Sequence, residues 1–141
     1  MLMPAGALSS ISRGFTGYHA GIDLAAPLGS TIRAAAAGTV QYAGWYSGYG
    51  NMVDILHADG LVTRYAHMSG YPPELGTGTP VKAGQIVGIV GNTGHSHGNH
   101  IHFEVRYQGR PHDPAPFLGL GRCIVVPPRV PVEEAFAPAA R

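Results

Sequence analysis

The stretch Gly98-Asn99-His100-Ile101-His102-Phe103-Glu104 is the segment from which the fold of this chain is best inferred. The run over residues 101–107 is rich in β-branched and aromatic residues, which favours a β-strand. Because residues two apart on a strand point to the same face, His100 and His102 are predicted to share one side of a sheet. The sequence around this pair therefore predicts a β protein with two imidazoles on one face.

A second motif, Tyr18-His19-Ala20-Gly21-Ile22-Asp23, adds a histidine and a carboxylate from a distant part of the chain. Imidazole nitrogen and carboxylate oxygen are ligands of catalytic zinc, which keeps one coordination position open. On an extended strand His19 and Asp23 would lie about 13 Å apart, too far to share an ion. Gly21 lets the backbone bend without a Cβ clash, so a turn is predicted between them. The two motifs together predict a zinc site.

The composition of the 141-residue chain restricts its class. Charged residues make up 12%, whereas there are 21 Gly and 12 Pro, which favours a turn-rich β protein. The formal net charge is +1, so there is no basic footprint for nucleic acid and no nucleic-acid partner is expected. Cys123 is alone, which excludes an intramolecular disulfide and a cysteine-based zinc site, whereas the 8 histidines offer imidazole ligands.

Short apolar runs alternate with turn signals, as in an antiparallel β-sandwich or barrel. The sequence Ala58-Asp59-Gly60 carries a strong hairpin signal, and it predicts an antiparallel hairpin that ends at His67. The fold class is therefore all-β. The expected strands span residues 31–35, 38–46, 51–57, 61–67, 86–90 and 101–107.

A weak internal repeat links two parts of the chain. Gly29-Ser30-Thr31-Ile32-Arg33-Ala34, followed by Gly38-Thr39-Val40, is similar to Gly78-Thr79-Pro80-Val81-Lys82-Ala83, followed by Gly84-Gln85-Ile86-Val87. Two such turn-plus-strand units predict two related halves of one sheet system, although two imperfect copies can also arise by chance.

The chain is expected to form one domain over residues 13–120, preceded by a loosely structured lead-in at residues 1–12. After Leu120 the composition shifts to proline and alanine, so residues 121–141 are expected to form an extended tail. No run approaches the roughly 20 apolar residues of a membrane span, so no span is expected. The start of the chain lacks the basic segment and long apolar core of a signal peptide.

Three motifs follow one another along the chain: His19-Ala20-Gly21-Ile22-Asp23, Tyr65-Ala66-His67-Met68 and His100-Ile101-His102-Phe103-Glu104-Val105-Arg106. With flanking sequences such as Gly48-Tyr49-Gly50-Asn51 and Gly91-Asn92-Thr93-Gly94, they closely resemble the LytM/lysostaphin-type zinc endopeptidases of peptidoglycan. The resemblance covers roughly residues 11–120. An isolated His-x-His would be a weak signal, whereas these elements in this order are specific.

The resemblance assigns roles residue by residue. It implies that His19, Asp23 and His102 bind zinc, and that His67 and His100 are catalytic histidines near the metal but not bound to it. Spacing alone does not tell which member of the His100/His102 pair binds the metal. Three protein ligands leave a position for a zinc-activated water, and the unliganded imidazoles can transfer protons near neutral pH.

The resemblance also implies an architecture and a function. The fold is expected to be a barrel-sandwich hybrid of the duplicated hybrid motif type, with short loops lining a zinc groove. The expected activity is hydrolysis of cross-links or stem peptides of peptidoglycan by a monomer in the cell envelope or secreted, with a phage-borne origin also open. One alternative is a non-catalytic peptidoglycan-binding regulator of another cell-wall hydrolase. Another is a carrier domain with related β architecture, which would need no open zinc position.

Several residues near the motifs have two interpretations. Glu104 shares the parity of the His pair, so it is expected either to orient a histidine N–H or to pair with an arginine. Asp54 and Arg64 are expected to form a cross-strand pair. His95 and His97 either line the cleft, bind a substrate carboxylate or a second zinc ion, or are exposed loop residues.

Other side chains are expected to be structural. His57 and His112 are predicted to be exposed hairpin and loop residues. Among the aromatic residues, Trp45 and Phe103 are predicted to lie in the core. Rings in the Gly-rich loop, Tyr46 and Tyr49, are expected to line a substrate groove.

Overall fold

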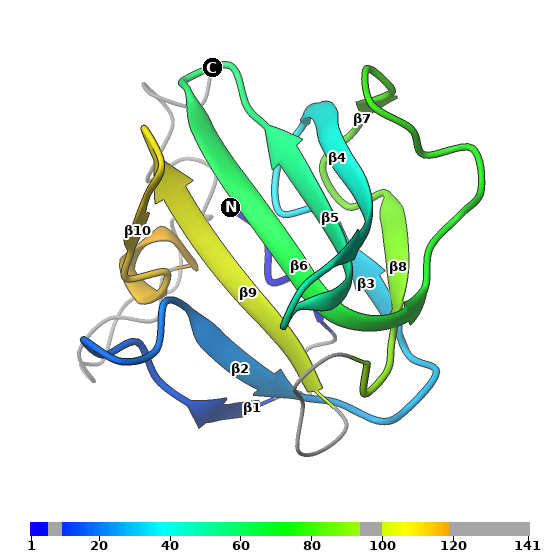
Figure 1. The fold of residues 1–141 in the computed structure, drawn as a ribbon. Helices are drawn as coiled ribbons and strands as arrows, with labels where there is room; N and C mark the ends of the chain where they lie inside the picture. Colours follow the sequence, from blue (N-terminus) through cyan, green and yellow to red (C-terminus); the bar gives the residue numbers. More distant parts are fainter. Residues whose placement is uncertain (6–9, 94–99, 119–141) are drawn as a thin grey trace.

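The computed structural model describes residues 1–5, 10–93 and 100–118. Within these residues the chain forms ten β-strands and one short 3-10 helix, joined by turns and loops (Figure 1). Within these residues no helix has the length and apolar composition needed to cross a lipid bilayer. The helix is η1 (Ala115–Leu118), and the strands are β1 (Ser10–Arg13), β2 (Ile22–Ala25), β3 (Thr31–Arg33), β4 (Gly38–Tyr46), β5 (Gly50–Leu56), β6 (Leu61–Gly70), β7 (Pro80–Val81), β8 (Ile86–Val90), β9 (His100–Tyr107) and β10 (Arg110–His112).

The strands pair antiparallel throughout, in the order β1-β2-β9-β6-β5-β4-β7. β10 adds to β9, and β8 pairs with both β3 and β6 behind the main sheet (Figure 1). The all-β antiparallel prediction is confirmed. The expected strands at 38–46 and 86–90 match β4 and β8, and the predicted hairpin is formed by β5 and β6.

The two copies of the internal repeat interlock. The first strand of the first copy, β3, pairs with β8 of the second copy, whereas the first strand of the second copy, β7, pairs with β4 of the first. A positive φ precedes the first strand of each copy, at Gly29 (88°) and Gly78 (96°), where a side chain would be strained. The sequence similarity between the copies therefore has a structural counterpart.

Strand β9 separates the core from the opposite face of the sheet. Ile101, Phe103 and Val105 are fully buried in the hydrophobic core, where the Phe103 ring lies 5.4 Å from that of Tyr65. His102 and Glu104 have the other parity and line a groove on the opposite face. The alternation predicted for residues 101–107 is thus observed.

The structure describes part of the predicted lead-in but not the predicted tail. The lead-in at 1–12 is not loose where the structure describes it: Met1 and Ala5 are buried, and the Leu2 N–H donates to the carbonyl of Ala35. The error arose because the backbone of residues 1–5 bonds to the β3 region, a long-range pairing that no local pattern shows. The tail at 121–141 lies outside the described residues, as do His95 and His97.

The predictions for Trp45 and His57 were wrong. Trp45 is 61% exposed because it lies near the end of β4, beside the β4–β5 turn, where its side chain projects into solvent. His57 is only 5% exposed and sits in a hydrogen-bonded chain: its Nδ1 lies 2.7 Å from the Ala37 carbonyl oxygen and its Nε2 lies 2.8 Å from Thr63 Oγ1. The Tyr65 hydroxyl continues the chain, 2.7 Å from Thr63 Oγ1. Both ring nitrogens of His57 are therefore satisfied inside the protein.

Burial of His57 predicts a pH dependence of stability. Burial lowers the pKa of His57 below its usual value, although the bond to Ala37 opposes this effect. Because the unfolded chain takes up the proton first, the free energy of unfolding falls as the pH drops below about 6.5. We expect the thermal midpoint of the His57→Gln variant to fall less between pH 7.5 and 5.5 than that of the native chain. Equal falls in the two proteins would refute this role for His57.

Candidate metal centre and active site

The sequence motifs meet where β2 lies beside β9. The register places Asp23 directly opposite His102, so the two side chains project from neighbouring strands on one face. Just before β2, the chain turns: Thr16 and His19 form a bridge with backbone N···O distances of 3.1 and 3.2 Å. After His19 the chain bends at Ala20 and Gly21, as predicted for the segment between His19 and Asp23, and this bend brings His19 beside the start of β2.

Gly21 allows a close approach between this turn and β9. A Cβ built on Gly21 would lie 2.2 Å from the Phe103 carbonyl oxygen and 2.8 Å from Cγ of Glu104. No side chain fits at that distance from a backbone carbonyl. Gly21 is therefore needed because two backbones touch, rather than because of an unusual φ, and this contact sets how closely His19 approaches His102.

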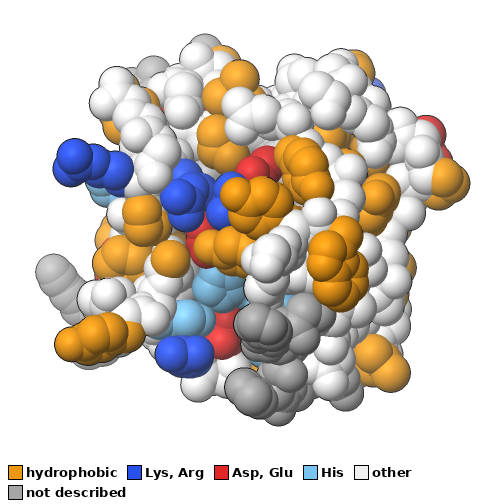
Figure 2. All heavy atoms as spheres, viewed as in Figure 1, with side chains coloured by type: hydrophobic (Ala, Val, Ile, Leu, Met, Phe, Trp, Pro, Cys, Tyr) orange, Lys and Arg blue, Asp and Glu red, His pale blue; other side chains and the backbone are white. Residues whose placement is uncertain are grey.

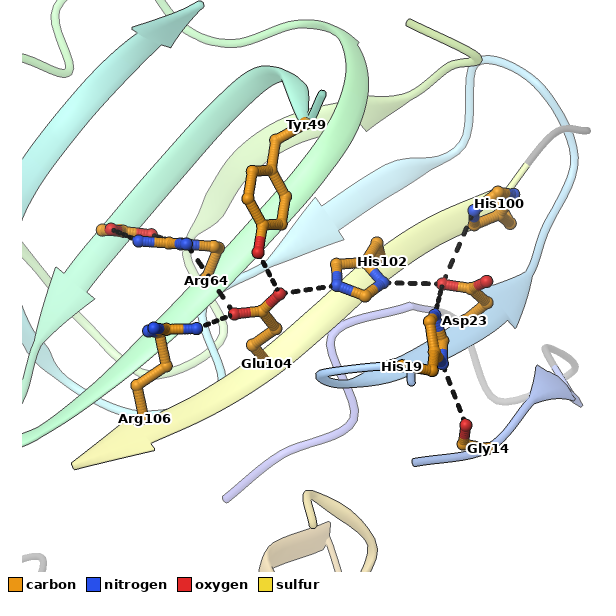
Figure 3. Close-up of polar contacts among 10 residues, drawn as sticks. Gly14, His19, Asp23, Tyr49, Arg64, His100, His102, Glu104 and Arg106 are labelled. Atoms are coloured by element: carbon orange, nitrogen blue, oxygen red, sulfur yellow. Dashed lines mark hydrogen bonds and ion pairs between the residues drawn. The ribbon is translucent and has the colours of Figure 1, made fainter. Parts of the chain in front are cut away.

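Three imidazoles converge on one carboxylate oxygen (Figure 3). Asp23 Oδ1 lies 2.8 Å from His102 Nδ1, 3.3 Å from His19 Nε2 and 3.6 Å from His100 Nε2. One ligand atom each from His19, Asp23 and His102 lie within 4.8 Å of one another, and all three residues are buried. This spacing suits the first coordination sphere of a small divalent cation.

Hydrogen bonds orient two of these imidazole rings. His19 Nδ1 lies 2.9 Å from the Gly14 carbonyl oxygen, which can only accept, so the neutral ring carries its proton on Nδ1. His102 lies between two carboxylates, with Nε2 2.7 Å from Oε2 of Glu104 and Nδ1 2.8 Å from Oδ1 of Asp23. The lone pair of His19 Nε2 faces Asp23, and His102 Nδ1 faces the same carboxylate and offers a lone pair once that nitrogen has lost its proton. Zinc ligands are typically oriented in this way by a carbonyl or carboxylate behind the ring.

Glu104 is the centre of a buried network behind His102 (Figure 3). Its side chain is fully buried and also accepts hydrogen bonds from the Tyr49 hydroxyl at 2.8 Å and from Arg106 at 2.5 Å. Arg64 lies 3.8 Å from the same carboxylate and is held in place by two 2.9 Å bonds to Asp54, which confirms the predicted cross-strand pair. Both interpretations of Glu104 are therefore correct, because one oxygen faces the histidine and the other faces the arginines.

The electrostatics of the site favour a charged Glu104 and Asp23. Burial opposes ionisation of Glu104, but its bonds to His102, Tyr49 and Arg106 outweigh burial and lower its pKa to about 2. Burial also opposes ionisation of Asp23, and the bond from His102 again prevails, so the pKa of Asp23 is lowered. The same two carboxylates outweigh the burial of His102 and raise its pKa. The two carboxylates thus favour positive charge between them, which is carried by the protonated His102 ring or by a cation bound in place of its proton.

His67 reaches the site through an unusual backbone. It lies in β6 at φ 60°, a conformation that non-glycine residues rarely adopt, where the register between β5 and β6 shifts. Its Nδ1 lies 2.6 Å from the Thr93 carbonyl oxygen, which leaves Nε2 as the acceptor of the neutral ring. Burial lowers the pKa of His67, which favours that neutral form. The His67 and His100 ring centroids are 5.3 Å apart.

The candidate site lies in an open groove of about 730 Å³. Figure 2 shows histidine and acidic side chains at the surface of this face, bordered by hydrophobic and basic side chains. The predicted lining by Tyr49 is observed, whereas Tyr46 contributes through a 5.9 Å ring contact with Tyr49. The groove is lined by Ser12, Arg13, Tyr18, His19, Ala20, Asp23, Ala25, Gly48, Tyr49, His67, His100, His102 and Glu104.

All the histidines and the aspartate proposed from sequence come together here. The sequence did not reveal the acceptors behind His19 and His67, because both are backbone carbonyl oxygens, of Gly14 and Thr93. It also did not reveal Arg13, because the pairing of β1 with β2 was not foreseen. The only usable signal for the Glu104 network was the shared parity of His102 and Glu104.

We expect Glu104→Gln to weaken zinc binding about 10- to 100-fold, the usual effect of removing a partner that orients a metal ligand. The amide keeps the shape but loses the charge that favours donation by His102 Nε2. Zinc affinity would be measured by competition with a chromogenic chelator. Asp54→Asn is the matched control, since Asp54 belongs to the same network without touching His102. Equal losses of affinity in the two variants would contradict a specific role for Glu104.

A buried His-Asp-His cluster on an antiparallel sheet, with further histidines beside it, has the ligand types of a catalytic metal centre. The family model described as Peptidase family M23 matches residues 17–114, and the chain belongs to this family.

A curated relative supports this assignment. The chain is 46% identical over 96 residues to the DD-carboxypeptidase/endopeptidase Mpg of Neisseria meningitidis, which covers 68% of this chain and 22% of Mpg. The chain therefore spans about a fifth of that relative's length.

Solved structures show the same fold. The catalytic domain of the antimicrobial peptidase lysostaphin from Staphylococcus simulans matches with a TM-score of 0.68 and 33% identity, over 77% of this chain and 88% of that one. A zinc-containing peptidase from Vibrio cholerae matches with a TM-score of 0.74 and 28% identity, over 88% of this chain and 39% of that one.

Proposed function

We propose that this chain is a zinc-dependent endopeptidase that hydrolyses peptide cross-links or stem peptides of bacterial peptidoglycan. The observation that carries the proposal is the convergence of His19, Asp23 and His102 within 4.8 Å, with the Gly14 carbonyl behind the His19 ring and the Glu104 carboxylate behind the His102 ring. Two further histidines, His67 and His100, lie beside this cluster.

The donor set fits zinc. Two neutral imidazoles and one carboxylate are three protein ligands, the number found in catalytic rather than structural zinc sites. Bound there, zinc supplies a Lewis acid that lowers the pKa of a coordinated water and polarises a peptide carbonyl. His19, Asp23 and His102 are proposed to hold it, and Glu104 fixes the orientation of the His102 ring.

The unliganded histidines are proposed to move protons. Nε2 of His67 is free to accept a proton, because its Nδ1 is engaged with the Thr93 carbonyl. The His100 ring lies beside it, with the two ring centroids 5.3 Å apart, and is proposed to donate to the leaving amine or to the developing oxyanion. Burial keeps the pKa of His67 below its usual value, so the ring is a neutral base at physiological pH.

The names of two relatives support the proposed substrate class. Mpg is named a DD-carboxypeptidase/endopeptidase and lysostaphin an antimicrobial peptidase, and both contain a region similar to this chain. We propose a stem-peptide cross-link between D-Ala and a diamino acid as the preferred substrate, with a glycine bridge as the second choice. The catalytic domain is proposed to span residues 13–120 and to act as a monomer in the cell envelope or as a secreted protein.

The proposal is tested with two defined substrates. Zinc-loaded protein is incubated with a cross-linked muropeptide dimer and, separately, with a pentaglycine peptide, each with and without chelator. Cleavage of the dimer that disappears with chelator and returns with added zinc is the expected result. Cleavage of pentaglycine alone would replace the preferred substrate by the second choice, and no cleavage of either at full zinc occupancy would refute the peptidase.

A further inference from the structure

Arg13 extends the row of residues that forms the candidate metal centre. In the sheet, Arg13 of β1 lies opposite Asp23 of β2, and Asp23 lies opposite His102 of β9. Directly opposite residues of antiparallel strands project to the same face. Arg13 therefore stands one strand beyond Asp23 on the metal-binding face, and its side chain lines the same groove.

The guanidinium of Arg13 is available for a ligand. Arg13 is exposed, and among the residues that the structure describes it has no hydrogen-bond or ion-pair partner. The other arginines near the groove differ, because Arg64 is bonded to Asp54 and Arg106 to Glu104. Those two arginines stabilise buried carboxylates, whereas the guanidinium of Arg13 can bind a ligand in the groove.

The charge of the groove favours an anion at this place. Asp23 is contacted by three imidazoles and Glu104 is balanced by its arginines, so among the described residues neither carboxylate bonds Arg13, which adds a positive charge to the groove. A guanidinium binds a carboxylate through two parallel N–H···O bonds, which gives both affinity and orientation.

The geometry limits where the carboxylate sits in the substrate. Neighbouring strands are about 4.8 Å apart, and an extended peptide advances about 3.4 Å per residue. The distance from the scissile bond to a carboxylate on the next residue is therefore similar to the one-strand distance from Asp23 to Arg13.

We propose that Arg13 binds a substrate carboxylate on the residue adjoining the scissile bond, and that this contact selects such substrates. The inference rests on the proposed function for the meaning of the scissile bond. Two carboxylates have this chemistry: the free C-terminus of a leaving D-amino acid, which makes the cleavage a carboxypeptidase reaction, and the side-chain carboxylate of a diamino acid.

The test measures binding separately from turnover. Zinc-loaded His67→Ala protein is titrated calorimetrically with three stem peptides that contain the same scissile bond: one with both carboxylates free, one amidated at the C-terminus and one amidated on the diamino acid. Arg13→Gln in this background is expected to weaken binding of the unmodified peptide about 10- to 100-fold, the range for a lost charge-assisted hydrogen bond. It should not weaken further the binding of whichever amidated peptide lacks the recognised carboxylate, and Arg13→Lys should restore part of the affinity.

Arg110→Gln is the matched control, because Arg110 is an exposed arginine on β10 that does not line the groove. Loss confined to one amidated peptide identifies the carboxylate that Arg13 recognises. Equal weakening of all three peptides by Arg13→Gln, or no weakening of any, overturns the inference. A chain that discriminates the peptides but hydrolyses none would refute the proposed function and leave the role of Arg13 intact.

Discussion

Asp23→Ala is expected to remove zinc binding and hydrolysis together, with both falling to background. Asp23 Oδ1 is the atom on which His19, His100 and His102 converge, so its loss leaves a cluster of imidazoles with no anion to offset the cation. His102→Ala is expected to have the same double effect, because it removes a ligand from the opposite strand. Zinc content would be measured by plasma mass spectrometry after gel filtration, and hydrolysis with the muropeptide dimer.

A matched control separates this effect from a general change in charge. Glu74→Ala also removes one negative charge, but Glu74 is exposed and does not line the groove. It is expected to keep full zinc occupancy and activity. Stoichiometric zinc in Asp23→Ala would show that the metal is held elsewhere, and the assignment of the centre would fail.

His67→Ala is expected to keep zinc and to lose turnover by about 10²- to 10⁴-fold, the usual contribution of general acid–base catalysis. The His67 side chain is held by the Thr93 carbonyl rather than by Asp23, so its removal leaves the His19-Asp23-His102 cluster intact. His100→Ala is expected to behave in the same way. The measurement is kcat on the muropeptide dimer at full zinc occupancy, checked on each preparation.

The two members of the His100/His102 pair are distinguished by the same assay. His102 contacts Asp23 Oδ1 at 2.8 Å and has Glu104 behind it, whereas His100 lies at 3.6 Å from the same oxygen. If His100→Ala emptied the metal centre while His102→Ala did not, the proposed roles within the pair would be reversed. Full activity of His67→Ala would show that this histidine only fills space.

The active-site strand could be predicted from sequence because its signals are local. Alternation along β9 places Ile101, Phe103 and Val105 in the core, and the opposite parity places His102 and Glu104 in the groove. Turn chemistry was also local: the Asp59-Gly60 pair predicted the β5–β6 hairpin that carries His67 to its place. For the same reason, the turn between His19 and Asp23 followed from the distance between them and from Gly21.

Long-range pairing was beyond local patterns. The lead-in was misjudged because residues 1–5 bond to the distant β3 region, where the Leu2 N–H donates to the Ala35 carbonyl. Arg13 was overlooked because β1 was not recognised as a strand that pairs with β2. His57 was misplaced because a histidine next to a turn is usually exposed, whereas here Thr63 and a backbone carbonyl satisfy its ring. The left-handed φ of His67 has no sequence signal either, because histidine adopts it only under tertiary constraint.

We propose above all that this chain uses a zinc centre at His19, Asp23 and His102 to cut peptide bonds in peptidoglycan. The most direct measurement is mass spectrometry of the fragments released from purified peptidoglycans of two cross-link chemistries, by the zinc-loaded protein and by a chelated control. We expect new amino termini from one wall type that appear only without chelator and that are absent with Asp23→Ala. No release from either wall by a protein with one bound zinc would contradict this proposal, and would instead support a non-catalytic module that regulates another hydrolase.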